Sequence, residues 1–309
     1  MVKIVIVGPG AIGCLIAAFL SRVKQAEVWL LDKDLARARR INKSGVFVQG
    51  INGKLKARVK ITACASQIKF CDLIIFCVKS YAAESALKTV KPLLNRNVCL
   101  LSLQNGLGNV EIISKISGNT NVWAGVIFLG ATLLSEANVR YAGAGKIIIG
   151  KKDGKITRRM RVLRDVFKNA GFEISLSKKI DAWIWHKLII NIGINALSAI
   201  TSLKNGDLLK YSEVRQILDL SVREAVCVAE KMGIKLIYKN MRKKTEAVCD
   251  FTAENISSML QDVLNRKKTE IDSLNGAIVR KAEEIGIDTP VNRVLTNLIK
   301  IKQLCYTQT

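Results

Sequence analysis

The chain has 309 residues, is 49% hydrophobic and carries a formal net charge of +24 at pH 7. This length and apolar content suit one large domain or, as we favour, two domains. No apolar run reaches the roughly 18 residues that a membrane-spanning helix needs, and the N-terminus lacks the charged and small-residue features of a signal peptide. We therefore expect a cytoplasmic protein with no membrane partner.

The numbers of histidine, cysteine and basic residues also limit the kinds of catalytic, metal-binding and nucleic-acid-binding site that the chain can form. The one histidine, His186, leaves a His–carboxylate dyad, a Ser–His–Asp triad or a multi-histidine metal site almost nothing to be built from, and no metal is expected. The eight cysteines form no CxxC pair and are interpreted as small apolar residues. Lys and Arg are spread along the chain, which favours a solvated basic surface suited to an anionic ligand. No specific nucleic-acid partner is expected.

The N-terminus predicts a dinucleotide-binding turn. A β-branched strand, Lys3–Val7, leads into Gly8-Pro9-Gly10-Ala11-Ile12-Gly13 and then into an apolar helix over Ile12–Arg22. In this spacing the first glycine permits the tight turn, the second lets a phosphate approach the backbone, and the third lets the helix pack close to the sheet. The helix N-terminus then faces the pyrophosphate, and its dipole favours the negative charge.

Strands and helices alternate through the first half of the chain. Further strands are predicted at Glu27–Leu31, Val46–Gln49, Arg58–Thr62, Asp72–Val78, Val98–Leu103, Val122–Ile127, Lys146–Gly150 and Phe172–Ser175. Helices are predicted between them at Leu35–Lys43, Ala82–Leu94, Gly108–Ile116 and Thr157–Ala170. This alternation predicts an N-terminal α/β Rossmann domain with a mostly parallel, doubly wound sheet.

The pattern becomes helical near Ser177, so we place a Rossmann domain at residues 1–177 and an all-α domain at residues 178–309. The helices of the second domain are expected at Ala182–Leu203, Ser212–Met232, Lys239–Cys249, Ala253–Val263, Thr269–Ile285 and Val291–Gln303.

Polar residues recur along one side of the first of these helices. Lys187, Asn191 and Asn195 are spaced four residues apart in a segment otherwise rich in Leu, Ile, Ala and Gly, and Ser198 joins them. A cation and two amides are costly to bury on such a helix unless they bind something. An ammonium can donate a proton to a ketone oxygen, and amides can orient a small polar substrate. His186 points away from this line and is interpreted as a packing or surface residue.

With these motifs the chain resembles the ketopantoate reductase (2-dehydropantoate 2-reductase) family. The resemblance rests on motifs that occur in order along nearly the whole chain. They are Gly8–Gly13, Val78-Lys79-Ser80, Leu103-Gln104-Asn105-Gly106-Leu107-Gly108, Trp185-x-Lys187-Leu188-x-x-Asn191-x-x-x-Asn195, Ser257–Asp262, Lys268–Asp272 and Thr289-Pro290-Val291-Asn292.

The resemblance implies a role for each matching residue. Lys187 would donate the proton to the C2 carbonyl oxygen of the keto acid and, like its neighbours in the site, would bind the substrate. The other substrate-binding residues would be Asn191, Asn195, Asn205 and Ser258. The cofactor would be bound by Gly8, Pro9, Gly10, Ala11, Ile12, Gly13, Asp32, Lys79, Asn105 and Glu270, with Glu270 lying between the two domains near the lysine.

The cofactor remains open between NADPH and NADH. Asp32 ends the second strand, where an acidic residue normally binds the ribose hydroxyls and repels a 2′-phosphate, a pattern typical of NADH. Lys33 and Arg37 lie close by and could neutralise a phosphate, and the family resemblance favours NADPH. We keep NADPH as the expected cofactor and NADH as the alternative.

The resemblance implies an NAD(P)H-dependent oxidoreductase that reduces 2-dehydropantoate to pantoate, on the route to pantothenate and coenzyme A. One alternative is a related reductase of another branched 2-keto acid. The other is a dinucleotide-binding sensor or a nucleic-acid-binding regulator without turnover, which the net charge supports. Whether the protein forms a homodimer stays open.

Overall fold

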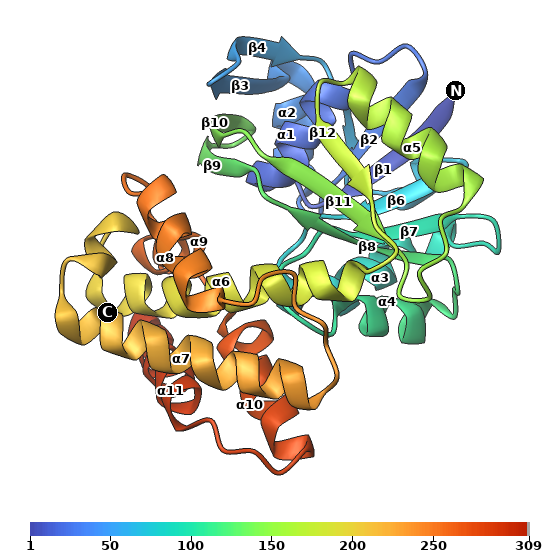
Figure 1. Ribbon diagram of the computed structural model, residues 1–309. Coiled ribbons are helices and arrows are strands. Elements are labelled where there is room, and N and C mark those ends of the chain that lie inside the picture. Colours follow the sequence, from blue (N-terminus) through green and yellow to red (C-terminus); the bar gives the residue numbers. More distant parts are fainter. Residues whose placement is uncertain (308–309) are drawn as a thin grey trace. The chain divides into compact units, whose positions relative to one another are not determined.

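The computed structural model describes residues 1–307, whose contacts divide into two compact units (Figure 1). Unit 1 comprises Met1–Gln104 and Gly108–Ile180, and unit 2 comprises Asn105–Leu107 and Asp181–Thr309. No helix within the described range is long and apolar enough to cross a membrane.

The strands all belong to unit 1. They are β1 (Val2–Val7), β2 (Ala26–Leu31), β3 (Val46–Gly50), β4 (Gly53–Ala57), β5 (Lys60–Thr62), β6 (Leu73–Phe76), β7 (Cys99–Ser102), β8 (Val122–Ile127), β9 (Gly130–Ser135), β10 (Asn138–Gly143), β11 (Lys146–Gly150) and β12 (Glu173–Leu176). The helices of this unit are α1 (Ala11–Leu20), α2 (Leu35–Ser44), α3 (Ala83–Val90), α4 (Asn109–Ser117) and α5 (Arg158–Asn169). Short 3₁₀ turns are η1 (Ala65–Gln67), η2 (Ser80–Ala82) and η3 (Lys91–Leu93).

The main sheet confirms the predicted Rossmann fold. Its strand order is β12-β11-β8-β7-β6-β1-β2-β5, and every neighbouring pair is parallel except β8 and β11. Strand order reverses at β1, which has β2 on one side and β6 on the other. In sheets of this kind a dinucleotide binds beyond the carboxyl ends of the strands at this switch point.

Helices cover both faces of the main sheet, as a doubly wound fold requires. Alternate side chains of β1 show the arrangement. Ile4 and Ile6 join the core that contains α1, α2 and α5, whereas Val5 and Val7 join the core that contains α3 and α4. Strands buried on both faces are nearly continuous apolar runs, which is why the sequence identified them.

A second, four-stranded sheet, with the order β4-β3-β10-β9, packs over α1 (Figure 1). Phe19 of α1 meets Tyr141 of β10 with ring centroids 6.0 Å apart. Of its strands the sequence predicted only the one at Val46–Gln49. β4, β9 and β10 were missed because they are half-exposed and contain polar residues and glycine, which weaken the apolar signal of a strand.

Unit 2 is helical, as expected. Its elements are α6 (Ile180–Thr201), η4 (Gly206–Leu209), α7 (Ser212–Lys231), α8 (Met241–Phe251), α9 (Ser258–Leu264), η5 (Ile271–Ser273), α10 (Asn275–Glu284), α11 (Pro290–Leu304) and η6 (Cys305–Thr307). At Gly193 of α6 an added Cβ would lie 2.9 Å from side chains of both Val222 and Thr245. The glycine thus lets α6 approach α7 and α8 closely.

Two helices of unit 2 begin later than predicted. The segment expected as one helix over Thr269–Ile285 divides at Leu274, whose φ and ψ are −104° and −105°, into η5 and α10. The helix expected from Ala253 begins at Ser258, because the Ser257 hydroxyl accepts a hydrogen bond from Leu260 N and caps it there.

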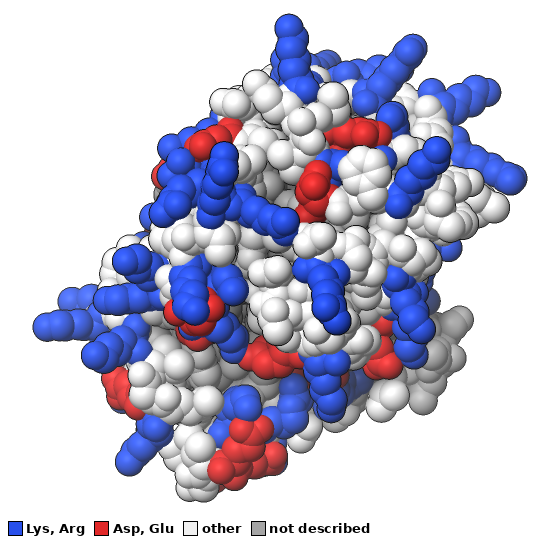
Figure 2. All heavy atoms as spheres, turned by 90° about the vertical axis from the view of Figure 1, so that its right-hand side faces the viewer, with Lys and Arg blue, Asp and Glu red and all other residues white. Residues whose placement is uncertain are grey.

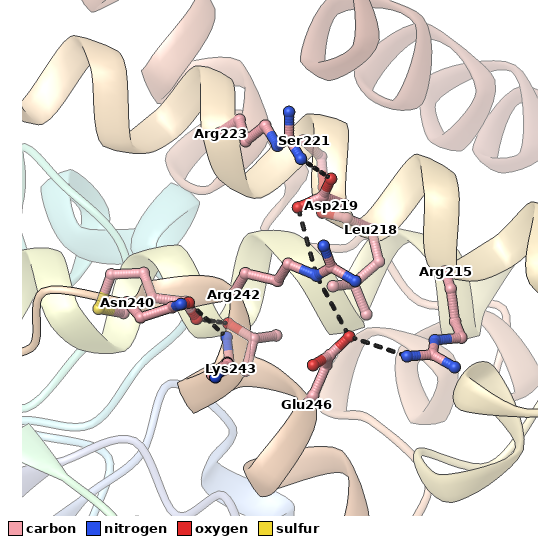
Figure 3. Close-up of polar contacts among 11 residues, drawn as sticks. Arg215, Leu218, Asp219, Ser221, Arg223, Asn240, Arg242, Lys243 and Glu246 are labelled. Carbon is pink, nitrogen blue, oxygen red and sulfur yellow. Dashed lines mark hydrogen bonds and ion pairs between the residues drawn. The ribbon is translucent and has the colours of Figure 1, made fainter.

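Ion pairs join α7 and α8 on the surface (Figure 3). Arg242 Nε lies 3.5 Å from Asp219 Oδ1 and 3.4 Å from Glu246 Oε1. Arg223 pairs with Asp219, and Arg215 pairs with Glu246. The arginines are substantially exposed, so each pair contributes little to stability.

Candidate active site

The turn between β1 and α1 has the geometry that a pyrophosphate needs. Gly8 has φ +97°, and a Cβ there would lie 2.6 Å from Val78 Cγ1. A Cβ on Gly13 would lie 2.1 Å from the Gly8 carbonyl oxygen. On Gly10, in contrast, it would meet no atom of the described chain within 4 Å. Two glycines therefore serve backbone packing, and the third leaves space for a phosphate.

The start of α1 can bind that anion. Gly10 is the N-cap residue and supplies no side-chain cap, and the first turn holds no acidic residue. The first intrahelical bond runs from Cys14 N to Gly10 O, so the preceding N–H groups, at Ala11, Ile12 and Gly13, point out of the helix end. The residues present thus fit a dinucleotide.

The ends of β6 and β7 border the same turn. Lys79 directly follows Val78, which packs on Gly8, and Gln104 Nε2 donates a hydrogen bond to Val78 O at 3.1 Å. Lys79 is partly buried at this edge. Gln104 joins the two strand ends, a structural role that its position in the sequence motif did not disclose.

Asp32 lies at the end of β2, beside the turn, since Gly8 N donates to Leu31 O. Its side chain is only 1% exposed and is held by a two-pronged ion pair with Arg37. Arg37 Nε donates to Oδ2 and Nη2 donates to Oδ1, both at 2.5 Å. The backbone N–H groups of Lys33 and Asp34 also donate to Oδ1. The charge of Asp32 is therefore largely compensated within unit 1.

The predicted line of polar residues lies on α6, a single helix of 22 residues. Lys187 and Asn191 are partly buried, and Asn195 is buried. Four-residue steps advance by about 40° on a helix, so all three share one side. Ser198 does not extend this set toward a ligand, because its hydroxyl donates to Leu203 O at 2.7 Å and ties down the end of the helix.

Lys187 has an unusual acidity. Burial lowers the pKa of its ammonium to about 8, and the Glu270 carboxylate opposes that change by favouring the charged form. Glu270 is itself 7% exposed and begins the 3₁₀ turn η5, rather than the first turn of an α-helix as the sequence predicted. A lysine of this kind can give up a proton near neutral pH, which an exposed lysine does poorly.

Asn105 belongs to the three-residue segment that clusters with unit 2. Its neighbour Gly106 has φ +85°, and a Cβ there would lie 2.2 Å from the carbonyl oxygen of Ser273. Leu107 N donates a hydrogen bond to that same oxygen. The segment around Asn105 is therefore fixed against η5, the turn that follows Glu270.

Two further predicted residues differ in setting. Asn205 is buried, its Nδ2 donates to Thr252 Oγ1 at 2.9 Å, and its Oδ1 has no hydrogen-bond partner in the described chain. Ser258 is exposed in the first turn of α9, next to the capping Ser257.

His186 is a packing residue, as interpreted from the sequence. It is 2% exposed, meets Trp183 edge-on at 5.9 Å and lies tilted against Tyr238 at 4.9 Å between ring centroids.

The basic charge is dispersed on the face that Figure 2 shows. Lys and Arg side chains project singly across it, with Asp and Glu between them, and much of the remaining surface is uncharged. On this face the arrangement is that of a solvated basic surface.

Comparison with known proteins decides the family. The family model described as "Ketopantoate reductase PanE/ApbA" matches residues 4–154, and its C-terminal counterpart matches residues 179–303. The chain belongs to the ketopantoate reductase family. It is therefore an NAD(P)H-dependent oxidoreductase of the class that acts on a ketone.

Individual relatives support the same family assignment. The chain is 34% identical to the 2-dehydropantoate 2-reductase of Archaeoglobus fulgidus over 301 residues, which are 96% of this chain and 97% of that protein. It is 34% identical to the Pyrococcus horikoshii 2-dehydropantoate 2-reductase, with 97% of each chain covered.

Solved structures resemble it over the same length. A PanE/ApbA family ketopantoate reductase from Ralstonia eutropha JMP134 has a TM-score of 0.91, is 30% identical and matches over 99% of both chains. A D-mandelate dehydrogenase solved with NADH and anilino(oxo)acetate also has a TM-score of 0.91, at 27% identity and 99% coverage of both chains.

Proposed function

We propose that this protein is a 2-dehydropantoate 2-reductase, which converts 2-dehydropantoate to pantoate for pantothenate and coenzyme A biosynthesis. The observation that carries the proposal is Lys187, a partly buried cation whose pKa is lowered to about 8 and which lies on the same side of α6 as Asn191 and Asn195. Relatives that cover nearly the whole chain and are named for this reaction support it.

The chemistry divides among a few groups. A bound nicotinamide supplies the hydride that reduces C2 of the keto acid. The Lys187 ammonium donates its proton to the C2 carbonyl oxygen, so that the ketone becomes an alcohol and the lysine becomes neutral until water reprotonates it. Asn191 and Asn195 orient the polar groups of the substrate, and the unpaired Oδ1 of Asn205 accepts a hydrogen bond from it. Ser258, at the start of α9, also binds the substrate.

The cofactor residues have matching roles. The N–H groups of Ala11, Ile12 and Gly13 would bind the pyrophosphate, and Gly10 would leave it the space. Lys79, Asn105 and Glu270 are the further residues that we propose would bind the cofactor.

We propose NADPH as the preferred cofactor. Because Arg37 compensates the charge of Asp32, the carboxylate repels a 2′-phosphate much less than an unpaired one would. Arg37 binds Asp32 through Nε and Nη2, so its Nη1 could donate to the phosphate, and the neighbouring Lys33 would add positive charge.

A direct assay tests both proposals. Oxidation of the cofactor is followed at 340 nm with 2-dehydropantoate, in parallel with NADPH and NADH. We expect turnover with both cofactors and a higher kcat/KM with NADPH. Cofactor binding without any turnover would overturn the reaction, and a higher kcat/KM with NADH would overturn the cofactor assignment.

The similarity to a D-mandelate dehydrogenase favours one second candidate, a reductase of another 2-keto acid. A panel of 2-keto acids that differ in branching and in aromatic substituents distinguishes the two. A kcat/KM for 2-dehydropantoate below that for an aromatic 2-keto acid would favour the second candidate.

Residues 1–177 and 178–309 are proposed as the two folding domains, which limited proteolysis tests. A cytoplasmic location stays a prediction, which cell fractionation tests. Sedimentation would determine whether the protein forms a homodimer.

A further inference from the structure

The segment that carries Glu270 is attached to one helix, α11, at both of its ends. Before Glu270, Thr269 N donates to Gln303 Oε1 at 2.7 Å, near the end of α11. After it, Asn275 Nδ2 donates to Asn292 Oδ1 at 3.0 Å, near the start of α11. Eleven residues of helix separate these two acceptors, or about 16 Å.

At the other end the Asn292 side chain makes hydrogen bonds through both its oxygen and its nitrogen, whereas Asn275 Oδ1 has no hydrogen-bond partner in the described chain. Asn292 and Asn275 are both 0% exposed. Asn292 Nδ2 donates to Ser221 O at 3.0 Å and to Glu224 Oε2 at 2.7 Å, both on α7. Glu224 also accepts from the backbone N–H groups of Val291 and Asn292 and so caps the N-terminus of α11. A buried amide with all its bonds made holds its partners in one arrangement, because any displacement leaves a polar atom unpaired.

Between the two attachments the segment is short and folded on itself. The carbonyl oxygen of Glu270 accepts from Ser273 N and from Ser273 Oγ, both at 3.0 Å. Lys300 of α11 pairs with Asp272 at 2.8 Å and adds a third, exposed tie. The backbone of Glu270 therefore has little freedom to move independently of α11.

We propose that Asn292 and Gln303 are positioning residues, through which α11 holds the Glu270 carboxylate at a fixed place relative to the Lys187 ammonium. The proposal deepens the proposed reductase function and rests on it for its catalytic meaning. Neither residue touches the reacting atoms in this scheme. The motif Thr289-Pro290-Val291-Asn292 then has a physical purpose, since Pro290 starts the helix, Glu224 caps it, and Asn292 bonds to the end of the Glu270 segment.

The test compares four variants with the wild type. Asn292→Ala and Gln303→Ala each remove one attachment. Gln303→Glu keeps an oxygen acceptor for Thr269 N and is the conservative rescue. Asn297→Ala is the matched control, since it changes an exposed residue on the same helix.

The first readout needs no turnover. The pKa of Lys187 is measured from the pH dependence of its labelling by acetic anhydride, with the peptide quantified by mass spectrometry. Removing an attachment weakens the influence of Glu270, so we expect this pKa to fall by about half a unit or more in both alanine variants. Gln303→Glu and Asn297→Ala are expected to stay at the wild-type value or, for Gln303→Glu, slightly above it.

The second readout is the pH profile of kcat with 2-dehydropantoate. The alkaline limb should move to lower pH in the alanine variants and remain in place in the other two.

If both alanine variants fold but keep the wild-type pKa and limb, and lose only thermal stability, α11 is merely structural and the proposal is wrong. If Asn292→Ala does not fold, the half-buried Gln303 pair decides alone. A wild type that does not turn over would refute the proposed function, while the labelling result still tests the positioning.

Discussion

Arg37 binds both carboxylate oxygens of Asp32, with Nε and Nη2 each 2.5 Å from an oxygen. The pair joins the end of β2 to the first turns of α2 and buries the carboxylate almost completely. Asp32 raises the pKa of the guanidinium by its hydrogen bond, so Arg37 stays charged throughout the working range of pH. An aspartate that the sequence presents as a mark of NADH is thus part of a compensated pair.

Removing the cation should change cofactor preference. Arg37→Gln leaves the Asp32 charge uncompensated beside the 2′-phosphate, so kcat/KM for NADPH should fall about tenfold or more, with a smaller change for NADH. Steady-state kinetics with both cofactors measure the ratio. Arg39→Gln, on the exposed side of α2, is the control. Equal losses with both cofactors would show that Arg37 does not discriminate between them.

The glycines of the first turn should separate folding from binding. Gly10→Ala places its Cβ in open space, so the variant should melt like the wild type but bind the dinucleotide more weakly. Gly13→Ala places its Cβ 2.1 Å from the Gly8 carbonyl oxygen and should lower the melting temperature, because the backbone must shift. Calorimetry and cofactor titration distinguish the two. If Gly10→Ala bound the cofactor as tightly as the wild type, the proposal that the pyrophosphate binds at this turn would be wrong.

Lys187→Ala should reduce kcat by about 10²–10⁴, the usual contribution of a positioned general acid. Lys187→Arg should not restore activity, because a guanidinium retains its proton at working pH. Circular dichroism checks that both variants fold. Nearly unchanged turnover in Lys187→Ala would mean that another group donates the proton.

Asn191→Ala should mainly raise KM for the keto acid, since an amide that orients the substrate is lost while the proton donor remains. Initial-rate kinetics at saturating cofactor measure the effect. A loss confined to cofactor affinity would contradict the substrate role of Asn191.

Activity should decline at alkaline pH. Lys187 must be protonated to act as an acid, and its pKa is about 8, so kcat should fall above about pH 8. Glu270 favours the protonated form, and Glu270→Gln should therefore move the decline to lower pH. The kcat profile from pH 6 to 10 measures both. If the alkaline limb of the kcat profile does not move in Glu270→Gln, Glu270 does not influence the ionisation of Lys187 during turnover.

The elements that the sequence predicted well are those with strong local periodicity. β1, the glycine turn and α1 follow directly from the apolar run and the glycine spacing. Three strands of the second sheet were missed because they are half-exposed and because the sheet is stabilised by pairing between segments far apart in the chain, such as β3 with β10. The break at Leu274 was missed because the residues around it are compatible with a helix, and the bonds to α11 are long-range.

By itself the sequence determined which residues share a surface. Periodicity alone places Lys187, Asn191 and Asn195 on one side of α6, and glycine spacing alone builds the phosphate turn, because both depend on backbone geometry within a few residues. Only the tertiary structure decided their electrostatics. The lowered pKa of Lys187 and the compensation of Asp32 depend on burial and on charges that folding brings near, and electrostatic energy is set by distance and surroundings in space.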